Sequence, residues 1–101
     1  MTATAETQLE GELWRCVEEC RLLGYNPSFF VQMIHDRGAL GACRKLINDD
    51  TPSDGFTKLW ELRRLDLTVE AVALRPPYSA LFTQAERLKS RRRLEAYGYR
   101  K

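Results

Sequence analysis

The chain contains three cysteines and a single histidine, the residue types with which proteins hold structural zinc. Cys16 and Cys20 are four positions apart, so both would project from one face of a helix. With His35 and Cys43 they would complete a tetrahedral set of three thiolates and one imidazole. Zinc knuckles, however, hold paired ligands across a turn, and this pair lies within an expected helix. Because buried cysteines commonly behave as small apolar residues, the sequence favours core packing and predicts no metal or other cofactor.

Basic side chains gather toward the end of the sequence. Residues 75–101 hold eight basic and two acidic residues, a net charge of +6, while residues 1–24 hold two basic and five acidic residues. At helical spacing, a basic stripe is formed by Lys89, Arg92, Arg93 and Arg100, with Tyr97 and Tyr99 beside it. Such a stripe can dock on phosphates or on an acidic protein surface. A solubilising face is the simpler alternative, although the charge exceeds what solubility requires.

Acidic residues offer a weaker indication of chemistry. Asp66 and Glu70 are four positions apart, and such pairs can bind magnesium or share a proton. More simply, both would favour the start of the helix that follows them. No nucleophile stands beside a base at a recognised spacing, and there is no glycine-rich phosphate loop. The sequence therefore predicts a protein that is not an enzyme.

Two aromatic residues are candidate anchors for a protein partner. Phe29 and Phe30 are consecutive, so one helix cannot turn both rings to a core unless it is buried on two sides. Phe29 is the one we expect to be exposed. Tyr78 follows two prolines that restrict its loop, and it is the second expected anchor.

These residues are positioned by an expected set of short helices. Apolar residues recur at helical spacing in six segments, residues 9–23, 27–37, 40–47, 56–64, 69–74 and 84–97. Glycines 24, 38 and 98 are expected to end three of them, and Thr83 with Glu86 forms a capping box. The pattern predicts an all-α, compact, single-domain bundle of about six short helices. Residues 1–8 are expected to be a flexible polar leader, residues 9–99 the helical domain and residues 100–101 a basic tail.

The length and composition of the chain limit the number of domains and the cellular location that can be expected. A chain of 101 residues is expected to form one domain. No apolar run approaches the roughly 20 residues that span a bilayer, so no membrane partner is expected. The first residues have neither the basic nor the apolar region of a secretory signal. An odd number of cysteines suits reduced thiols, so a cytoplasmic location is expected.

A family of small uncharacterised bacterial domains resembles this chain in three segments, GYNPSFFVQMI, PSDGFTKLWELRRLDLTVEAVAL and LFTQAERLKSRRRLEAYGY. The shared motifs are a G-F-x-x-L-W-E-x-x-R-L-D-L-T-V-E-A core and an L-F-T…R-R-L-x-x-Y-G-Y ending. The resemblance covers about residues 13–99. It implies an all-helical bacterial module, freestanding or appended to larger proteins. It implies no activity, cofactor or catalytic residue.

Together these features predict a binding function. We expect a non-enzymatic accessory, adaptor or inhibitor protein of bacterial, phage or mobile-element origin, which binds a protein through the basic stripe and the exposed aromatic residues. The alternative is a nucleic-acid-binding protein that uses the same stripe on phosphates. Self-association is a third possibility, in which the acidic first helix of one copy meets the basic last helix of another. The same two helices could instead pack together within one chain.

Overall fold

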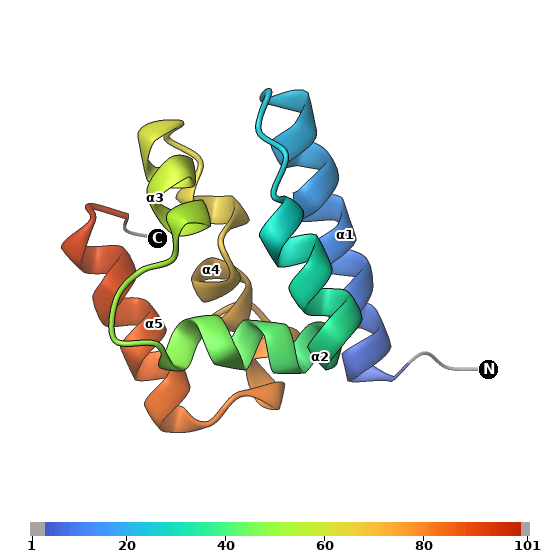
Figure 1. The fold of residues 1–101 in the computed structure, drawn as a ribbon. Helices are drawn as coiled ribbons and strands as arrows, with labels where there is room; N and C mark the ends of the chain where they lie inside the picture. The colour runs from blue at the N-terminus through green and yellow to red at the C-terminus, as the bar shows by residue number, and fades with distance from the viewer. Residues whose placement is uncertain (1–3, 100–101) are drawn as a thin grey trace.

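Residues 4–99, described by the computed structural model of the chain, fold into five α-helices and two short 3₁₀ helices (Figure 1). In chain order the elements are α1 (Ala5–Leu22), α2 (Ser28–Asn48), α3 (Asp54–Glu61), η1 (Leu65–Leu67), α4 (Val69–Ala73), η2 (Tyr78–Leu81) and α5 (Gln84–Ala96). No strand occurs within the described residues, and the predicted all-α class is confirmed.

The first helix begins earlier than expected. The Thr4 hydroxyl accepts a hydrogen bond from the Thr7 backbone N–H and caps α1, which therefore starts at Ala5. Residues 5–8, expected to belong to a flexible leader, form the first turn of the helix. Residues 1–3 and the basic tail at residues 100–101 lie outside the described residues.

Gly38 bends α2 into two halves. Its backbone has φ 79° and ψ 169°, a conformation essentially restricted to glycine. The two segments expected at residues 27–37 and 40–47 are thus the halves of one kinked helix. Figure 1 shows the first half running beside α1 and the second half turning away to cross the lower part of the view.

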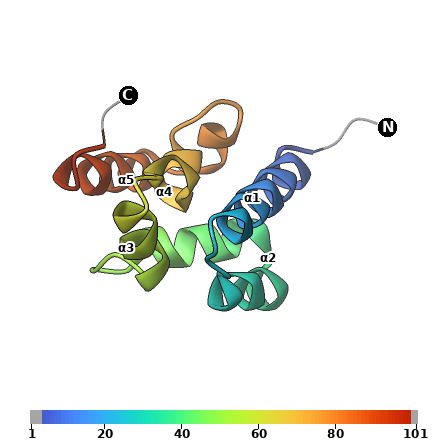
Figure 2. The same cartoon turned by 90° about the horizontal axis from the view of Figure 1, so that it is seen from above.

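The kink places α4 at the centre of the fold. In both views the hairpin of α1 and the first half of α2 occupies the right side, and α3 and α5 the left (Figure 1; Figure 2). The second half of α2 crosses between the two sides and packs against α4 and α5. All five residues of α4 are buried, so this short helix is stabilised by its surroundings rather than by its own length.

Three helices end with the same backbone turn, in which the residue after the C-cap adopts a left-handed conformation. After α1 this residue is Gly24 (φ 85°), and after α5 it is Gly98 (φ 84°). After α3 it is Arg63 (φ 60°), although a side chain there costs about 1 kcal/mol relative to glycine. Paired hydrogen bonds close this third turn, from Arg64 N to Leu59 O (2.8 Å) and from Arg63 N to Trp60 O (3.0 Å). Arg63 is the strained member of the set.

Between residues 4 and 99, none of the helices combines the length and the apolar character that crossing a bilayer would require.

Candidate functional site

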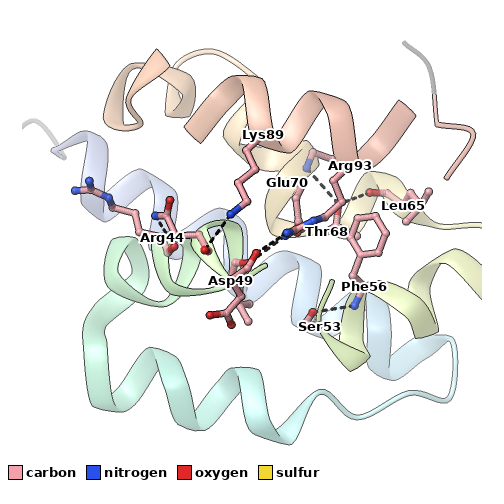
Figure 3. Close-up of polar contacts among 12 residues, drawn as sticks. Arg44, Asp49, Ser53, Phe56, Leu65, Thr68, Glu70, Lys89 and Arg93 are labelled. Carbon is pink, nitrogen blue, oxygen red and sulfur yellow. Dashed lines mark hydrogen bonds and ion pairs between the residues drawn. The ribbon is translucent and has the colours of Figure 1, made fainter. Parts of the chain in front are cut away.

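The basic residues of α5 divide between the protein's own backbone and its surface. Lys89 Nζ donates to Asn48 O (3.0 Å), and Arg93 donates to Leu46 O (3.1 Å) and Asp49 O (2.6 Å). These carbonyls end α2, where a helix has no internal donors for them and where its dipole favours cations. Figure 3 shows both side chains reaching from α5 to this helix end.

Arg93 is also held by a buried ion pair. Its Nη1 lies 2.9 Å from Oε2 of Glu70, and the two side chains are 7% and 2% exposed. Burial raises the pKa of the Glu70 carboxyl, and the Arg93 guanidinium opposes that effect. The expected continuous stripe is therefore wrong at Arg93, because this residue connects α5 to α4 and α2 rather than facing a partner.

The other basic residues of the stripe have surroundings different from those of Arg93. Arg92 is exposed, whereas Lys89 is half-buried by its contact with α2. Arg100 lies outside the described residues. Arg91 is exposed, and within residues 4–99 no ion pair joins it to Glu95, which lies four residues further along α5. The acidic helix α1 does not neutralise the stripe, since α5 packs chiefly on α2 and α4.

Glu86 forms a second polar connection between α5 and α2 that sequence reasoning did not find. Its Oε1 accepts from the Thr83 backbone N–H (2.9 Å), which completes the predicted capping box. Its Oε2 accepts from Arg44 Nε and Asn48 Nδ2, each at 2.8 Å. Burial alone would raise the pKa of this carboxyl, but these hydrogen bonds outweigh it and lower the pKa to about 2.

A signal for the Glu70 contact was present in the sequence. Glu70 is the one acidic residue in the apolar run at residues 69–74, and a buried carboxylate requires a cation. The sequence does not indicate which cation, because Arg93 is 23 residues away.

The four residues that could have formed a zinc site are not brought together. Cys16, Cys20 and Cys43 are buried in the core, while His35 is exposed, with its ring centroid 5.8 Å from that of Trp14 and the two ring planes inclined by 48°. Across residues 4–99, no three cysteine, histidine or acidic side chains converge closely enough to hold a metal ion. Burial raises the pKa of Cys16 to about 11 and that of Cys43 further, so both thiols stay protonated at neutral pH.

Phe29 is strongly exposed at an apolar pocket. Its side chain is 87% exposed in the first turn of α2. It lines a pocket of about 300 Å³ formed by α1, the first half of α2, the start of α3 and the segment entering α4. The walls are mainly apolar and include Val17, Phe30 and Met33. Both charged residues that line this apolar pocket are acidic, the exposed Asp54 and the buried Glu70.

The three expected tyrosines have different environments. Tyr78 is half-buried against the core and so is less available than its loop position suggested. Tyr97 packs edge-on against Phe56 (5.0 Å) and Trp60 (5.5 Å), and is half-buried. Tyr99 is also half-buried, and it lines two adjoining surface clefts near the end of α5.

Comparison with models of known protein families, with curated proteins and with solved structures finds no match to this chain. The family resemblance therefore stays a prediction.

Proposed function

We propose that this protein is a non-enzymatic protein-binding module that takes an apolar side chain of its partner into the pocket beside Phe29. The observation that carries this proposal is the 87% exposure of Phe29 at an apolar pocket of about 300 Å³. A large aromatic ring left in water beside an apolar hollow is the arrangement found at the anchor points of protein interfaces.

Charge indicates the chemistry of the partner. Because Asp54 and Glu70 are the charged residues of the pocket wall, a cation next to the apolar anchor would be favoured there. Since Glu70 is already paired with Arg93, Asp54 is the group left to attract it. The partner segment is therefore an amphipathic one with a large apolar side chain and a neighbouring lysine or arginine.

Nucleic acid bound through the stripe has less support. Lys89 and Arg93 contact carbonyl oxygens at the end of α2, which leaves Arg92 as the exposed member of the stripe within residues 4–99. We therefore retain protein binding, by an accessory, adaptor or inhibitor protein in a cytoplasm, as the proposed function. The three unbridged thiols suit such a reducing compartment.

The test is retention of a partner from nuclease-treated bacterial lysate by immobilised wild-type protein and by variants. Phe29→Ala should weaken the retained complex at least tenfold, because truncating a central aromatic anchor removes much of the binding free energy. Asp54→Asn should weaken it less and reduce its salt dependence. Leu22→Ala is the matched control, since Leu22 is 74% exposed but does not line the pocket.

Circular dichroism would show that each variant remains folded. Equal retention by wild type and Phe29→Ala would contradict the proposal. Loss of every partner on nuclease treatment would instead favour nucleic acid.

A further inference from the structure

Arg63 occupies a backbone position for which the same chain twice uses glycine. The turns after α1 and α5 contain Gly24 and Gly98, and the matching turn after α3 contains Arg63 at φ 60°. The helix dipole does not require this arginine, because Arg64 already places a cation at the end of α3. Arg64 also forms an ion pair with the nearby carboxylate of Asp66, with its Nε 3.0 Å from Oδ1. Strained residues of this kind concentrate at functional surfaces, so the surroundings of the Arg63 side chain bear on function.

The Arg63 side chain is exposed and lines a cleft of about 620 Å³ between the ends of α3 and α5. Trp60 and Tyr97 form one wall of this cleft, with their rings 5.5 Å apart and inclined by 80°. Trp60 is 46% exposed, and Tyr97 is fixed from behind by Phe56. Within residues 4–99, the Arg63 guanidinium and the Trp60 indole N–H have no hydrogen-bond partner. The cleft therefore presents rigid aromatic surface together with unused donors.

A second cleft, of about 500 Å³, continues from the first at Tyr99, which lines both. Arg75 and Arg91 line it from the segment after α4 and from α5. Arg75 Nη2 donates to Glu12, and its Nε is buried without an acceptor among residues 4–99. We call the joined clefts the C-terminal groove, lined by Trp60, Arg63, Tyr97, Tyr99, Arg91 and Arg75. The guanidiniums of Arg63 and Arg91 and the indole N–H of Trp60 are donors along the groove that suit acceptor atoms of a ligand.

The signs of the charges distinguish between classes of ligand. Glu61 and Glu95 also line the groove, and Arg75 is already paired with Glu12, so Arg63 and Arg91 share it with two glutamates. A phosphate backbone carries a uniform negative charge and would meet both glutamates. A protein segment can place carboxylates at the arginines and leave neutral residues opposite the glutamates. Tryptophan, tyrosine and arginine are also the residues that dominate protein interfaces.

We infer that the C-terminal groove binds an extended acidic segment of a partner protein, with carboxylates on Arg63 and Arg91 and an apolar residue on Trp60 and Tyr99. Arginine binds carboxylates through two parallel hydrogen bonds, which gives direction as well as attraction. This inference rests on the proposed protein-binding function but uses a surface separate from the Phe29 pocket.

The test measures binding of a fluorescent synthetic peptide of repeated Glu-Leu-Glu-Pro units to the full chain. We expect saturable binding that shifts the Trp60 indole N–H resonance, and much weaker binding of the matching Gln-Leu-Gln-Pro peptide. Arg63→Gly should reduce affinity about tenfold or more, because it removes a charge-assisted pair. The same change should leave Tm equal to or above that of the wild type, because it removes the strained side chain from the turn.

Two further variants separate the contribution of the Arg63 side chain to binding from the effects of backbone strain and of net charge. Arg63→Ala should lose the same affinity without the gain in Tm, since alanine keeps the strain. Arg37→Ala is the control for net charge, because Arg37 is an exposed arginine of α2 that lines neither cleft. It should bind the acidic peptide like the wild type.

Three results would overturn the inference. These are binding of the neutral peptide as tight as the acidic one, wild-type affinity in Arg63→Gly, and no binding of the acidic peptide. Tighter binding of an oligodeoxythymidine that shifts the same indole resonance would assign the groove to nucleic acid instead. Because the peptide test does not use Phe29, its failure can be told apart from failure of the pocket proposal.

Discussion

Two adjacent arginines illustrate how strongly position decides the role of a residue type. Arg93 is buried in contact with Glu70, Leu46 O and Asp49 O, while Arg92 points into solvent. On a helix, neighbouring residues are about 100° apart, so only one of the two can face α2 and α4. The stripe drawn from spacing alone groups residues that the fold separates.

Arg93→Ala should lower the free energy of unfolding by about 3–5 kcal/mol, since it leaves a buried carboxylate without its cation. Arg92→Ala should change it by less than about 0.5 kcal/mol, as is usual for an exposed side chain. Urea unfolding at neutral pH measures both. Similar effects of the two substitutions would contradict the environments described for them.

The cysteines provide a second residue-scale prediction. All three thiols are buried, and burial raises the pKa of Cys16 to about 11 and the pKa values of Cys20 and Cys43 as well. Since the thiolate is the reactive form, none should react quickly with an aromatic disulfide reagent at pH 8. Unfolding in denaturant should release all three. A fast-reacting thiol in the folded protein would show that a cysteine is more accessible than its burial indicates.

At the scale of elements, the bend in α2 depends on one glycine. Gly38→Ala should lower the free energy of unfolding by about 1–3 kcal/mol, because alanine strains the conformation at φ 79° and ψ 169°. An added methyl would meet no atom within 4 Å, so the effect comes from the backbone.

Gly11 within α1 supplies the matched control. Its position is also open, but it is helical, so Gly11→Ala should raise the free energy of unfolding by about 0.5–1 kcal/mol. Thermal unfolding of the two variants should thus shift in opposite directions. A melting temperature above that of the wild type in both variants would mean that α2 does not need its bend.

The junction of α5 with α2 should be sensitive to acid. Glu86 is nearly buried, with its side chain 5% exposed, and its hydrogen bonds lower its pKa from 4.5 to about 2. A carboxyl whose pKa is lower in the folded state stabilises the fold above the unfolded pKa, and this contribution is lost as pH falls. We expect about 3 kcal/mol to disappear between roughly pH 5 and pH 2.

Glu86→Gln should flatten this part of the stability profile, as measured by urea unfolding across that pH range. The exposed Glu6, in the first turn of α1, supplies the control Glu6→Gln, which should retain the acid dependence of the wild type. An unchanged slope in Glu86→Gln would mean that other carboxyls account for the acid sensitivity.

At the scale of the whole molecule, an ion pair joins the N-terminal hairpin to the chain after α4. Glu12 Oε2 lies 2.9 Å from Arg75 Nη2, and the side chains are 13% and 27% exposed. A double-mutant cycle with Glu12→Gln and Arg75→Met should give a coupling free energy of about 1 kcal/mol. The exposed pair of Glu18 and Arg21, at 3.9 Å, should give less than about 0.3 kcal/mol. Equal coupling free energies in the two cycles would show that the ion pair of Glu12 and Arg75 stabilises the protein no more than an exposed pair does.

The two proposed binding surfaces meet at α3. Residues at its start, including Asp54 and Phe56, line the apolar pocket, and residues at its end, Trp60 and Glu61, line the C-terminal groove. A single partner segment lying along α3 could therefore contact both surfaces.

The sequence by itself determined the class of fold and most helix ends. Apolar spacing, the capping box at Thr83 and Glu86, and the glycines at residues 24, 38 and 98 are local signals, and each acts within a few residues. It also indicated that Phe29 would be exposed, because two consecutive rings cannot share one helix face.

Only the tertiary structure decided how the charged and aromatic residues are used. The pairing of Arg93 with Glu70, and of Glu86 with Arg44, joins residues 23 and 42 positions apart, and local periodicity carries no information about such distances. The C-terminal groove likewise needs the end of α3 to lie against the end of α5. That arrangement follows from the bend at Gly38 and from the burial of α4, because packing rather than spacing brings these helices together.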